Sequence, residues 1–199
     1  MKYNSLALYC GSSAGNNPNF RTLAADFGRR CAEKQLTLYY GGASIGLMAE
    51  ASNAARTLGG RVVGIAPNFF SNRSVIDTSL DELILVDSMS ERKQLLESSA
   101  DGFVILPGSY GTMDEFFEMM TDAQLGLHSK PIAIVNTEGY YDHLIAQLER
   151  FRADGFLRPF HYDLLIVANN LDELFDKLDR YENSNDQEWL KHHIKNRIK

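Results

Sequence analysis

Short runs of apolar residues alternate along this chain with longer segments in which apolar residues recur three and four positions apart. The second pattern places apolar side chains on one face of a helix, as with Leu144, Leu148 and Phe151. The short runs are apolar at almost every position, which is typical of strands that are covered on both faces of a sheet. This alternation predicts a three-layer α/β fold, with a parallel sheet of about seven strands between two layers of helices.

The expected elements are spread along almost the whole chain. The predicted strands are residues 6–10, 36–40, 61–65, 83–86, 102–106, 131–135 and 164–168. The predicted helices are residues 20–34, 45–58, 90–100, 112–127, 140–153 and 171–181. Residues 68–80 are the least regular part, and we expect them to form a loop beside a ligand pocket.

The length of 199 residues suits one domain with a sizeable core, and we predict a single domain over residues 1–182. Residues 183–199 mix Trp189, Leu190 and Ile194 with several basic side chains. This segment is either a terminal helix docked on the domain or a charged tail in solvent, and the sequence leaves both open.

The charge and the cysteines restrict the class of partner and the compartment. A formal net charge of −6 argues against general nucleic-acid binding, which usually needs a basic face, but a few amides and basic side chains still hold a small anion. Cys10 and Cys31 fit reduced thiols in a cytosol better than a disulfide scaffold. The apolar stretch near the N-terminus is too short for a signal peptide or a membrane span. We therefore expect a cytoplasmic protein without a membrane or nucleic-acid partner.

Several common enzyme motifs are missing from the sequence. There is no Walker lysine motif, and no Gly-x-Gly-x-x-Gly follows the first predicted strand, which disfavours a dinucleotide dehydrogenase. Ser12 and Ser13 lack the Gly-x-Ser-x-Gly setting of a serine nucleophile. The histidines are scattered, and we expect them to be structural or solvated rather than catalytic. We predict no metal site.

Glycine or small hydroxyl residues follow four of the predicted strands, at residues 10–15, 41–46, 87–93 and 107–112. In an open parallel sheet, ligands bind beyond the carboxyl ends of the strands, near the point where strand order reverses. Such loops leave backbone N–H groups accessible to a ligand. The sequence therefore predicts a binding site at this edge of the sheet.

The strongest single element is a strand–turn–helix junction from Pro107 to Glu115. Gly108 and Gly111 permit a tight turn, and a helix is expected to begin near Thr112. The free N–H groups and the positive dipole end of that helix suit a phosphate without any lysine. The alternative is structural, because Thr112-x-x-Glu115 is also the pattern of a capping box in which Glu115 bonds back to the Thr112 N–H.

A basic pair lies in the opening turns of another predicted helix. Ser88-x-x-Glu91 has the pattern of a capping box, which places Arg92 and Lys93 one turn inside that helix. Positive charge near a helix N-terminus is unfavourable by roughly 0.3–1 kcal/mol per exposed residue. Two such residues indicate a bound anion, and the alternative is a solvated pair that reaches away from the helix dipole.

These residues resemble the "Lonely Guy" (LOG) family of Rossmann-like nucleotide phosphoribohydrolases. Members carry Pro-Gly-Gly-x-Gly-Thr-x-x-Glu where this chain has residues 107–115, and an Arg-Lys pair after a methionine where it has Met89, Arg92 and Lys93. The similarity covers roughly residues 6–156 in the family's order. Further matching blocks are residues 10–13, 46–48, 121–126, 128–131 and 139–141.

The resemblance implies a Rossmann-like fold, a homodimer, and no metal or redox cofactor. It also implies hydrolysis of a nucleoside 5'-monophosphate, either AMP or a cytokinin riboside 5'-monophosphate, to a free base and ribose 5-phosphate. The family is often called "possible lysine decarboxylase". Nothing in the sequence suggests a pyridoxal phosphate site, so we do not adopt that activity.

Carried over by position, Arg92 and Glu115 are the expected catalytic residues. The expected substrate-binding residues come from the same motifs and from the loops at the strand ends, and are Gly11, Ser12, Ser13, Gly42, Met89, Lys93, Gly108, Ser109, Tyr110, Gly111, Thr112 and Thr121. Departure of the base leaves positive charge on the ribose, as in glycoside hydrolysis. The Glu115 carboxylate would stabilise that charge, hold the ribose hydroxyls or direct water. Arg92 would hold the phosphate or polarise the departing base.

Departures from the family pattern bear on the base preference most of all. Ser109 replaces a glycine, and a positive φ at that position would strain a serine by about 1 kcal/mol or more. Ser90 and Asp122 stand where better-known members have histidine and tryptophan, and Ala43 and Ala49 replace glycines. The substitution at residue 109 motivates an alternative, a protein that binds a nucleotide or a phosphorylated cofactor without cleaving it. A third hypothesis is an enzyme of a different phosphosugar.

Overall fold

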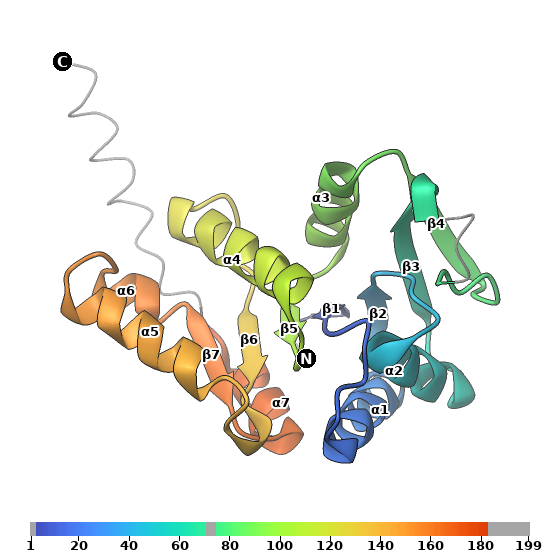
Figure 1. Ribbon diagram of the computed structural model, residues 1–199, viewed down its shortest axis with the longest axis horizontal. Coiled ribbons are helices and arrows are strands. Elements are labelled where there is room, and N and C mark those ends of the chain that lie inside the picture. The colour runs from blue at the N-terminus through green and yellow to red at the C-terminus, as the bar shows by residue number, and fades with distance from the viewer. Residues whose placement is uncertain (1–2, 71–74, 183–199) are drawn as a thin grey trace.

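The computed structural model describes residues 3–70 and 75–182, and within them seven parallel strands form one sheet of order β4-β3-β2-β1-β5-β6-β7 (Figure 1). The prediction of a parallel sheet of about seven strands is therefore confirmed. The strands are β1 (Ser5–Tyr9), β2 (Thr37–Tyr40), β3 (Val62–Pro67), β4 (Glu82–Val86), β5 (Phe103–Ile105), β6 (Ile132–Val135) and β7 (Leu165–Ala168).

All six predicted helices are present, with ends that shift by a few residues. They are α1 (Pro18–Glu33), α2 (Gly46–Thr57), α3 (Met89–Ser99), α4 (Tyr110–Leu125), α5 (Asp142–Ala153) and α7 (Leu171–Arg180). The sequence analysis missed the single turn α6 (Pro159–Tyr162) and the 3₁₀ turns η1 (Asn68–Phe70) and η2 (Thr137–Gly139). One turn is too short to display a helical period of apolar residues.

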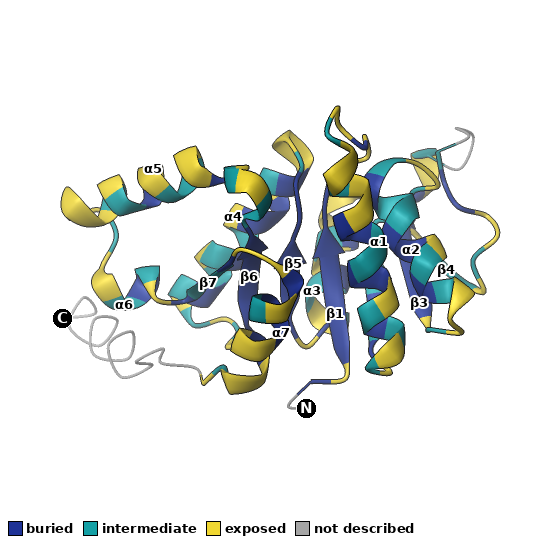
Figure 2. Ribbon diagram, turned by 90° about the horizontal axis from the view of Figure 1, so that it is seen from below, coloured by how far each residue is buried: buried dark blue, intermediate teal, exposed yellow. Residues whose placement is uncertain are grey.

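Helices cover both faces of the sheet, and each face has its own apolar core. One core joins α1, α2 and α7 through side chains such as Phe27, Leu47 and Phe175. The other joins α3, α4 and α5 through side chains such as Leu96 and Phe116. Successive side chains of a strand point to opposite faces, so the central strand β1 must be apolar at consecutive positions. All five of its residues are buried (Figure 2).

The order of the strands reverses at β1. The chain runs outward from β1 through β2 and β3 to β4, and then returns to the other side of β1 to add β5, β6 and β7. The loops that leave β1 and β5 consequently lie side by side, and the Gly11 N–H donates to the Pro107 carbonyl at 2.9 Å. This is the position at which α/β sheets bind ligands, and it is where the sequence predicts a site.

The structure bears on the expectations for the cysteines, for a membrane span and for residues 68–80, but not on the expectation for the C-terminal segment. Cys10 and Cys31 are buried free thiols, and burial raises the pKa of both. No helix in the described part of the chain is long and apolar enough to cross a membrane. The irregular stretch 68–80 borders a pocket, as predicted, through Phe70, Val75 and Ile76. The expectation for residues 183–199 lies outside the described residues.

Candidate active site

A pocket of about 330 Å³ opens at the carboxyl end of the sheet, among the loops that follow β1, β2, β3 and β5. Eight of the fourteen predicted site residues line it: Gly11, Ser12, Met89, Arg92, Ser109, Gly111, Thr112 and Glu115. Both predicted catalytic residues are in this set. Their charges lie in a lining that is otherwise largely apolar.

Arg92 of α3 and Glu115 of α4 form a buried ion pair, with 2.6 Å between Nη1 and Oε1. Both residues are 8% exposed. The Arg92 Nε–H also donates to the carbonyl of Ile65 on β3, at 3.1 Å. The guanidinium is therefore held at two points, and its planar donors leave it little freedom to turn.

The burial of Glu115 affects its acidity. Desolvation raises the pKa of this carboxyl above its ordinary 4.5, and the charge and hydrogen bond of Arg92 oppose the rise. A buried carboxylate beside a pocket, next to one fixed cation, is a common arrangement in catalytic sites. The pair can present negative charge to a ligand while the arginine limits the cost of burying it.

The start of α3 brings Arg92 to the pocket. Ser88 is the N-cap, and its Oγ accepts the N–H of Glu91 at 3.1 Å. The Glu91 carboxylate accepts the N–H of Asp87, at 2.9 Å, instead of the N-cap N–H that a standard capping box would use. The predicted cap is thus present with this shift of one residue. Arg92 follows it by one turn and points towards Glu115 rather than into solvent.

The start of α4 differs from the prediction. The helix begins at Tyr110, two residues before Thr112, with Ser109 as an N-cap that makes no side-chain capping bond. The capping-box alternative for Thr112 and Glu115 is wrong, because Glu115 lies inside the helix and bonds to Arg92. Earlier initiation places the free N–H groups of the first turn at residues 109–112.

The serine that departs from the family pattern is tolerated without backbone strain. Ser109 has φ −119°, outside the left-handed region, so the strain that a positive φ would cause does not arise. The adjacent Gly108 is the constrained position. A Cβ on Gly108 would lie 2.1 Å from the Thr112 Oγ1 and would prevent the turn from packing against the helix.

Gly41 at the end of β2 is a residue of this pocket that the sequence analysis did not select. A Cβ there would lie 2.2 Å from Arg92 Nη2 and 3.0 Å from Met48 Sδ. Because Arg92 is fixed by two hydrogen bonds, the guanidinium cannot easily move aside. The only sequence signal was the glycine-rich stretch 41–46, which did not distinguish Gly41 from Gly42.

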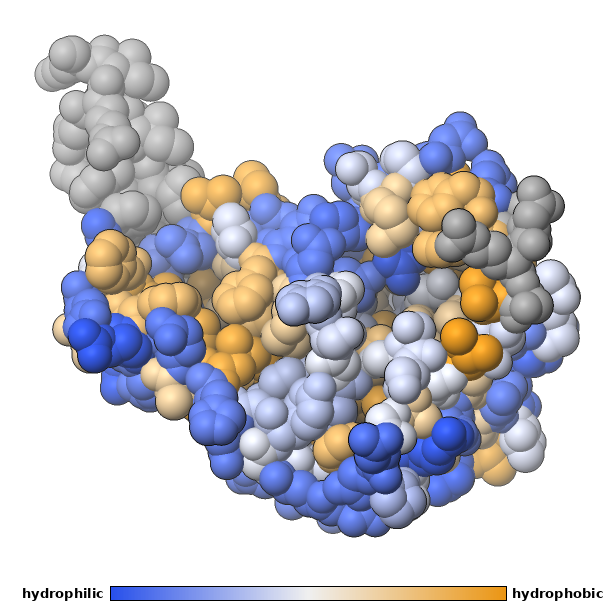
Figure 3. All heavy atoms as spheres, in the orientation of Figure 1, coloured by the Kyte–Doolittle hydropathy of each residue, from blue (hydrophilic) through white to orange (hydrophobic). Residues whose placement is uncertain are grey.

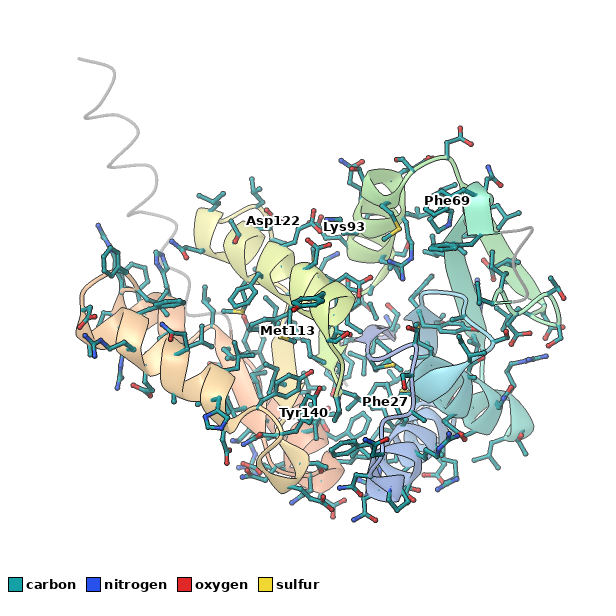
Figure 4. The ribbon with its side chains drawn as sticks, viewed as in Figure 1. Phe27, Phe69, Lys93, Met113, Asp122 and Tyr140 are labelled. Carbon is teal, nitrogen blue, oxygen red and sulfur yellow. The ribbon has the colours of Figure 1, made fainter. Side chains whose placement is uncertain are left out.

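Three predicted binding residues lie outside the pocket, where Lys93 of α3 faces Tyr110 and Thr121 on the outer face of α4. The Lys93 Nζ pairs with Glu118 at 3.0 Å and with Asp114 at 3.2 Å, and Figure 4 shows Lys93 beside this helix. The Thr121 hydroxyl donates to the Phe117 carbonyl at 2.7 Å. Tyr110 is 93% exposed. Lys93, Tyr110 and Thr121 together line a separate open hollow of this face.

The other three predicted residues are close to the pocket but do not line it. Ser13 and Gly108 line an adjoining hollow of about 160 Å³, which shares Gly11, Ser12 and Ser109 with the pocket. Gly42 has φ +70° and packs against the side chains of β3 and β4. It gives the second loop a backbone conformation that other residues rarely adopt.

Comparison with known proteins shows the family to which this chain belongs. Residues 48–178 match the family model described as "Possible lysine decarboxylase". The chain is 38% identical to the probable cytokinin riboside 5'-monophosphate phosphoribohydrolase LOGL9 of Oryza sativa subsp. japonica, over 90% of this chain and 79% of that protein. It is 36% identical to the cytokinin riboside 5'-monophosphate phosphoribohydrolase LOG5 of Arabidopsis thaliana, over 93% and 81% respectively. The chain belongs to the LOG family.

Solved structures share the fold of this LOG-family chain at lower sequence identity. The molybdenum cofactor binding protein from Rippkaea orientalis superposes with a TM-score of 0.68 and 19% identity, over 90% of this chain and 98% of that one. The molybdenum cofactor carrier protein from Chlamydomonas reinhardtii gives a TM-score of 0.67 and 20% identity, over 90% and 98%. At this identity the likeness supports the three-layer fold and carries no assignment of ligand.

The LOG-family pocket offers three kinds of contact to a ligand. The first turn of α4 presents amides, the Arg92–Glu115 pair presents charge, and Ile45, Phe70 and Met89 present apolar surface. Within the described residues no three histidine, cysteine, aspartate or glutamate side chains gather as ligands for a metal ion. An anionic, partly apolar molecule with a polar centre fits these contacts.

Proposed function

We propose that this LOG-family chain hydrolyses the N-glycosidic bond of a nucleoside 5'-monophosphate and releases a free base and ribose 5-phosphate. AMP or a cytokinin riboside 5'-monophosphate is the proposed substrate. The observation that carries the proposal is the buried Arg92–Glu115 pair, which opens onto a pocket beside the free amides of α4. The names of the relatives at 36–38% identity support the same reaction.

The phosphate would anchor the substrate at the first turn of α4. The N–H groups of residues 109–112 have no partner within the helix, and the positive dipole end favours an anion. Ser109, Gly111 and Thr112 all line the pocket. An anchored phosphate places the ribose next to Glu115, one turn further along the same helix, and so restricts the geometry of the reacting bond.

Glu115 would act on the charge that develops as the bond breaks. The electron pair of the C1'–N bond leaves with the base, which takes up one proton, and water adds its oxygen to C1' and loses one proton. Positive charge builds on the ribose in between. A carboxylate fixed in a site of low dielectric stabilises that charge without reorganising. Arg92 would keep Glu115 ionised and aligned, which is what its 2.6 Å contact with this carboxylate supports.

The base would occupy the apolar end of the pocket. Ile45, Phe70, Val75, Ile76 and Met89 provide surfaces for the faces of a planar ring. Among the described residues that line this end, few side chains offer donors or acceptors for the edges of the ring. We therefore expect the shape of the base, and any apolar substituent, to influence affinity more than its hydrogen-bonding edge does.

The test is to incubate the protein with AMP, GMP, CMP and UMP, and with adenosine as a substrate without phosphate, and to separate free base by chromatography. We expect base from at least one monophosphate and far less from adenosine. Binding of a monophosphate by calorimetry, with no free base after long incubation, would favour the alternative of a non-catalytic nucleotide or phosphorylated-cofactor binding protein. Turnover of other phosphosugars alone would favour the third hypothesis.

We further propose that the protein is a cytoplasmic homodimer. Exposed apolar side chains on and around α4 support a second copy on this face: Phe117, Leu125, Leu127 and Phe156. Figure 3 shows hydrophobic side chains gathered over α4 and α5. A partner seated there would also bring Lys93, Tyr110 and Thr121 close to an interface. Light scattering of the purified chain tests the dimer, and a monomer at micromolar concentration would exclude it.

A further inference from the structure

The motif Gly139-Tyr140-Tyr141 at the start of α5 is not part of the pocket, and the proposed mechanism leaves it without a role. Both tyrosine hydroxyls nevertheless reach the loop between β5 and α4. The Tyr140 hydroxyl donates to the Gly108 carbonyl at 2.8 Å. The Tyr141 hydroxyl donates to the Leu106 carbonyl at 2.7 Å, in the interior.

A third donor completes this set. The carbonyl of Pro107, which lies between the other two, accepts the Gly11 N–H at 2.9 Å. Three consecutive carbonyls of the loop are therefore held by donors from the segment before α5 and from the loop after β1. The peptide bonds of the described residues are all trans, so the C=O and N–H of one peptide unit point in opposite directions.

The consequence is clearest for the peptide that joins Gly108 to Ser109. Tyr140 bonds to its C=O from the side of the small hollow that Tyr140 itself lines. The N–H of the same peptide belongs to Ser109, which also lines the main pocket, and it points away from Tyr140. A hydrogen bond to the carbonyl also polarises the peptide and makes its N–H a better donor.

The tyrosine ring is itself held in place. Tyr140 packs edge-on against Phe20 of α1 with ring centroids 5.3 Å apart, and edge-on against Tyr141 at 4.8 Å. Figure 4 shows Tyr140 projecting from the loop before α5 towards the base of α4. The preceding Gly139 has φ +71°, a conformation that favours glycine and sets the direction in which the tyrosine pair leaves the loop.

We propose that Tyr140 is a positioning residue for phosphate binding: its hydroxyl fixes the Gly108–Ser109 peptide so that the Ser109 N–H faces the phosphate of the substrate. This inference rests on the phosphate-binding part of the proposed function and not on bond cleavage. Without the hydroxyl, water can solvate the Gly108 carbonyl, but the peptide is free to rotate. The effect should therefore appear in the affinity for phosphorylated ligands and not in the rate of the chemical step.

The experiment compares Tyr140→Phe with the wild-type chain and with Tyr3→Phe. The control removes the hydrogen bond of another tyrosine hydroxyl, to Asp179 at 3.0 Å, at the opposite end of β1. Calorimetry measures the Kd for ribose 5-phosphate and for adenine. In Tyr140→Phe we expect a three- to tenfold weaker affinity for ribose 5-phosphate, the range of one net hydrogen bond, and an unchanged affinity for adenine. We expect KM for AMP to rise by a similar factor and kcat to change less than twofold.

Several results would overturn the inference. One is an affinity for ribose 5-phosphate in Tyr140→Phe within twofold of wild type, and another is an equal loss for adenine, which indicates general damage. If the variant does not fold, NMR of the wild-type chain decides: ribose 5-phosphate must shift the Ser109 amide proton downfield, and shifts confined to Gly111 and Thr112 would contradict the role.

The same measurements separate this inference from the proposed reaction. A wild-type chain that binds ribose 5-phosphate in a Tyr140-dependent way but releases no base from AMP would refute the reaction alone. A wild-type chain that binds neither AMP nor ribose 5-phosphate would refute both.

Discussion

Arg92 on α3 and Glu115 on α4 are 23 residues apart in sequence, and their side chains meet at 2.6 Å in the buried wall of the pocket. The two helices follow β4 and β5, which are separated in the sheet by β3, β2 and β1. Arg92 spans this distance with two hydrogen bonds. Its Nε–H donates to the carbonyl of Ile65 on β3, and its Nη1 donates to Glu115 on α4. The pair therefore joins the two halves of the sheet on either side of the point where strand order reverses.

Removing the charge of Glu115 tests the centre of the proposed mechanism. In Glu115→Gln the shape of the side chain is kept, but the negative charge that would stabilise the ribose is lost. We expect kcat for base release from AMP to fall by about 10²–10³, the range seen when one electrostatic contact to a transition state is removed. Steady-state kinetics measures this, with circular dichroism to verify the fold.

The matched control is Glu50→Gln, which neutralises a partly exposed glutamate also paired with an arginine, Arg21, at 2.7 Å. Its turnover should stay within twofold of wild type. Wild-type kcat in Glu115→Gln would remove this residue from the catalytic role.

The acidic limb of the pH–rate profile should report Glu115. Burial raises its pKa above 4.5, so the carboxylate that the mechanism needs is protonated at a higher pH than an ordinary glutamate. Below that pKa, kcat/KM should fall about tenfold per pH unit. Arg92 opposes the rise, so Arg92→Ala, besides lowering the rate, should move the inflection of its residual activity to higher pH. An inflection that stays fixed or moves to lower pH would contradict the coupling.

Gly41→Ala should disturb the Arg92–Glu115 pair by displacing the guanidinium. The added Cβ would lie 2.2 Å from Arg92 Nη2, so the guanidinium must leave its bond to Glu115 or to Ile65. We expect kcat to fall at least tenfold and the free energy of unfolding to fall by about 1–3 kcal/mol, as in other overpacked interiors. Chemical denaturation and AMP kinetics measure the two effects.

A double-mutant cycle identifies the route of that effect. In an Arg92→Ala background the clash is gone, so adding Gly41→Ala should cost little further activity. Additive losses would mean that Gly41 acts through some other contact, such as Met48, whose Sδ would lie 3.0 Å from the new Cβ.

Gly108 and Gly111, at the junction of β5 and α4, should respond in opposite ways to alanine. In Gly108→Ala the Cβ meets Thr112 Oγ1 at 2.1 Å, so the turn cannot close and stability should fall. In Gly111→Ala the Cβ has nothing within 4 Å, and alanine is favoured over glycine inside a helix by about 1 kcal/mol. That variant should unfold at a higher temperature but bind AMP more weakly, because the methyl group occupies space beside the proposed phosphate. Calorimetry of unfolding and of binding tests both predictions. An unchanged affinity for AMP in Gly111→Ala would contradict the proposed position of the phosphate beside Gly111.

The order of the elements was predictable because it depends on local patterns. Runs such as residues 102–106 are apolar at consecutive positions since β5 is buried on both faces, and the amphipathic segments repeat with the helical period. The same logic located the edge of the sheet that carries the pocket, because the loops that follow parallel strands must meet there. Single-turn elements and helix ends were less predictable, since α4 begins two residues before the threonine expected to cap it.

By itself, the sequence determined the sheet, its two layers of helices, and a set of motifs that resemble one family. Only the tertiary structure decided which of the motif residues share a pocket. It turned Arg92 inward to Glu115 and its neighbour Lys93 outward to Glu118. It also placed Gly41 against the Arg92 guanidinium, where a side chain would not fit, and placed the Tyr140 hydroxyl within hydrogen-bond distance of the Gly108 carbonyl. The physical reason is that these contacts join segments far apart along the chain, so their distances depend on how strands and helices pack and leave no local pattern in the sequence.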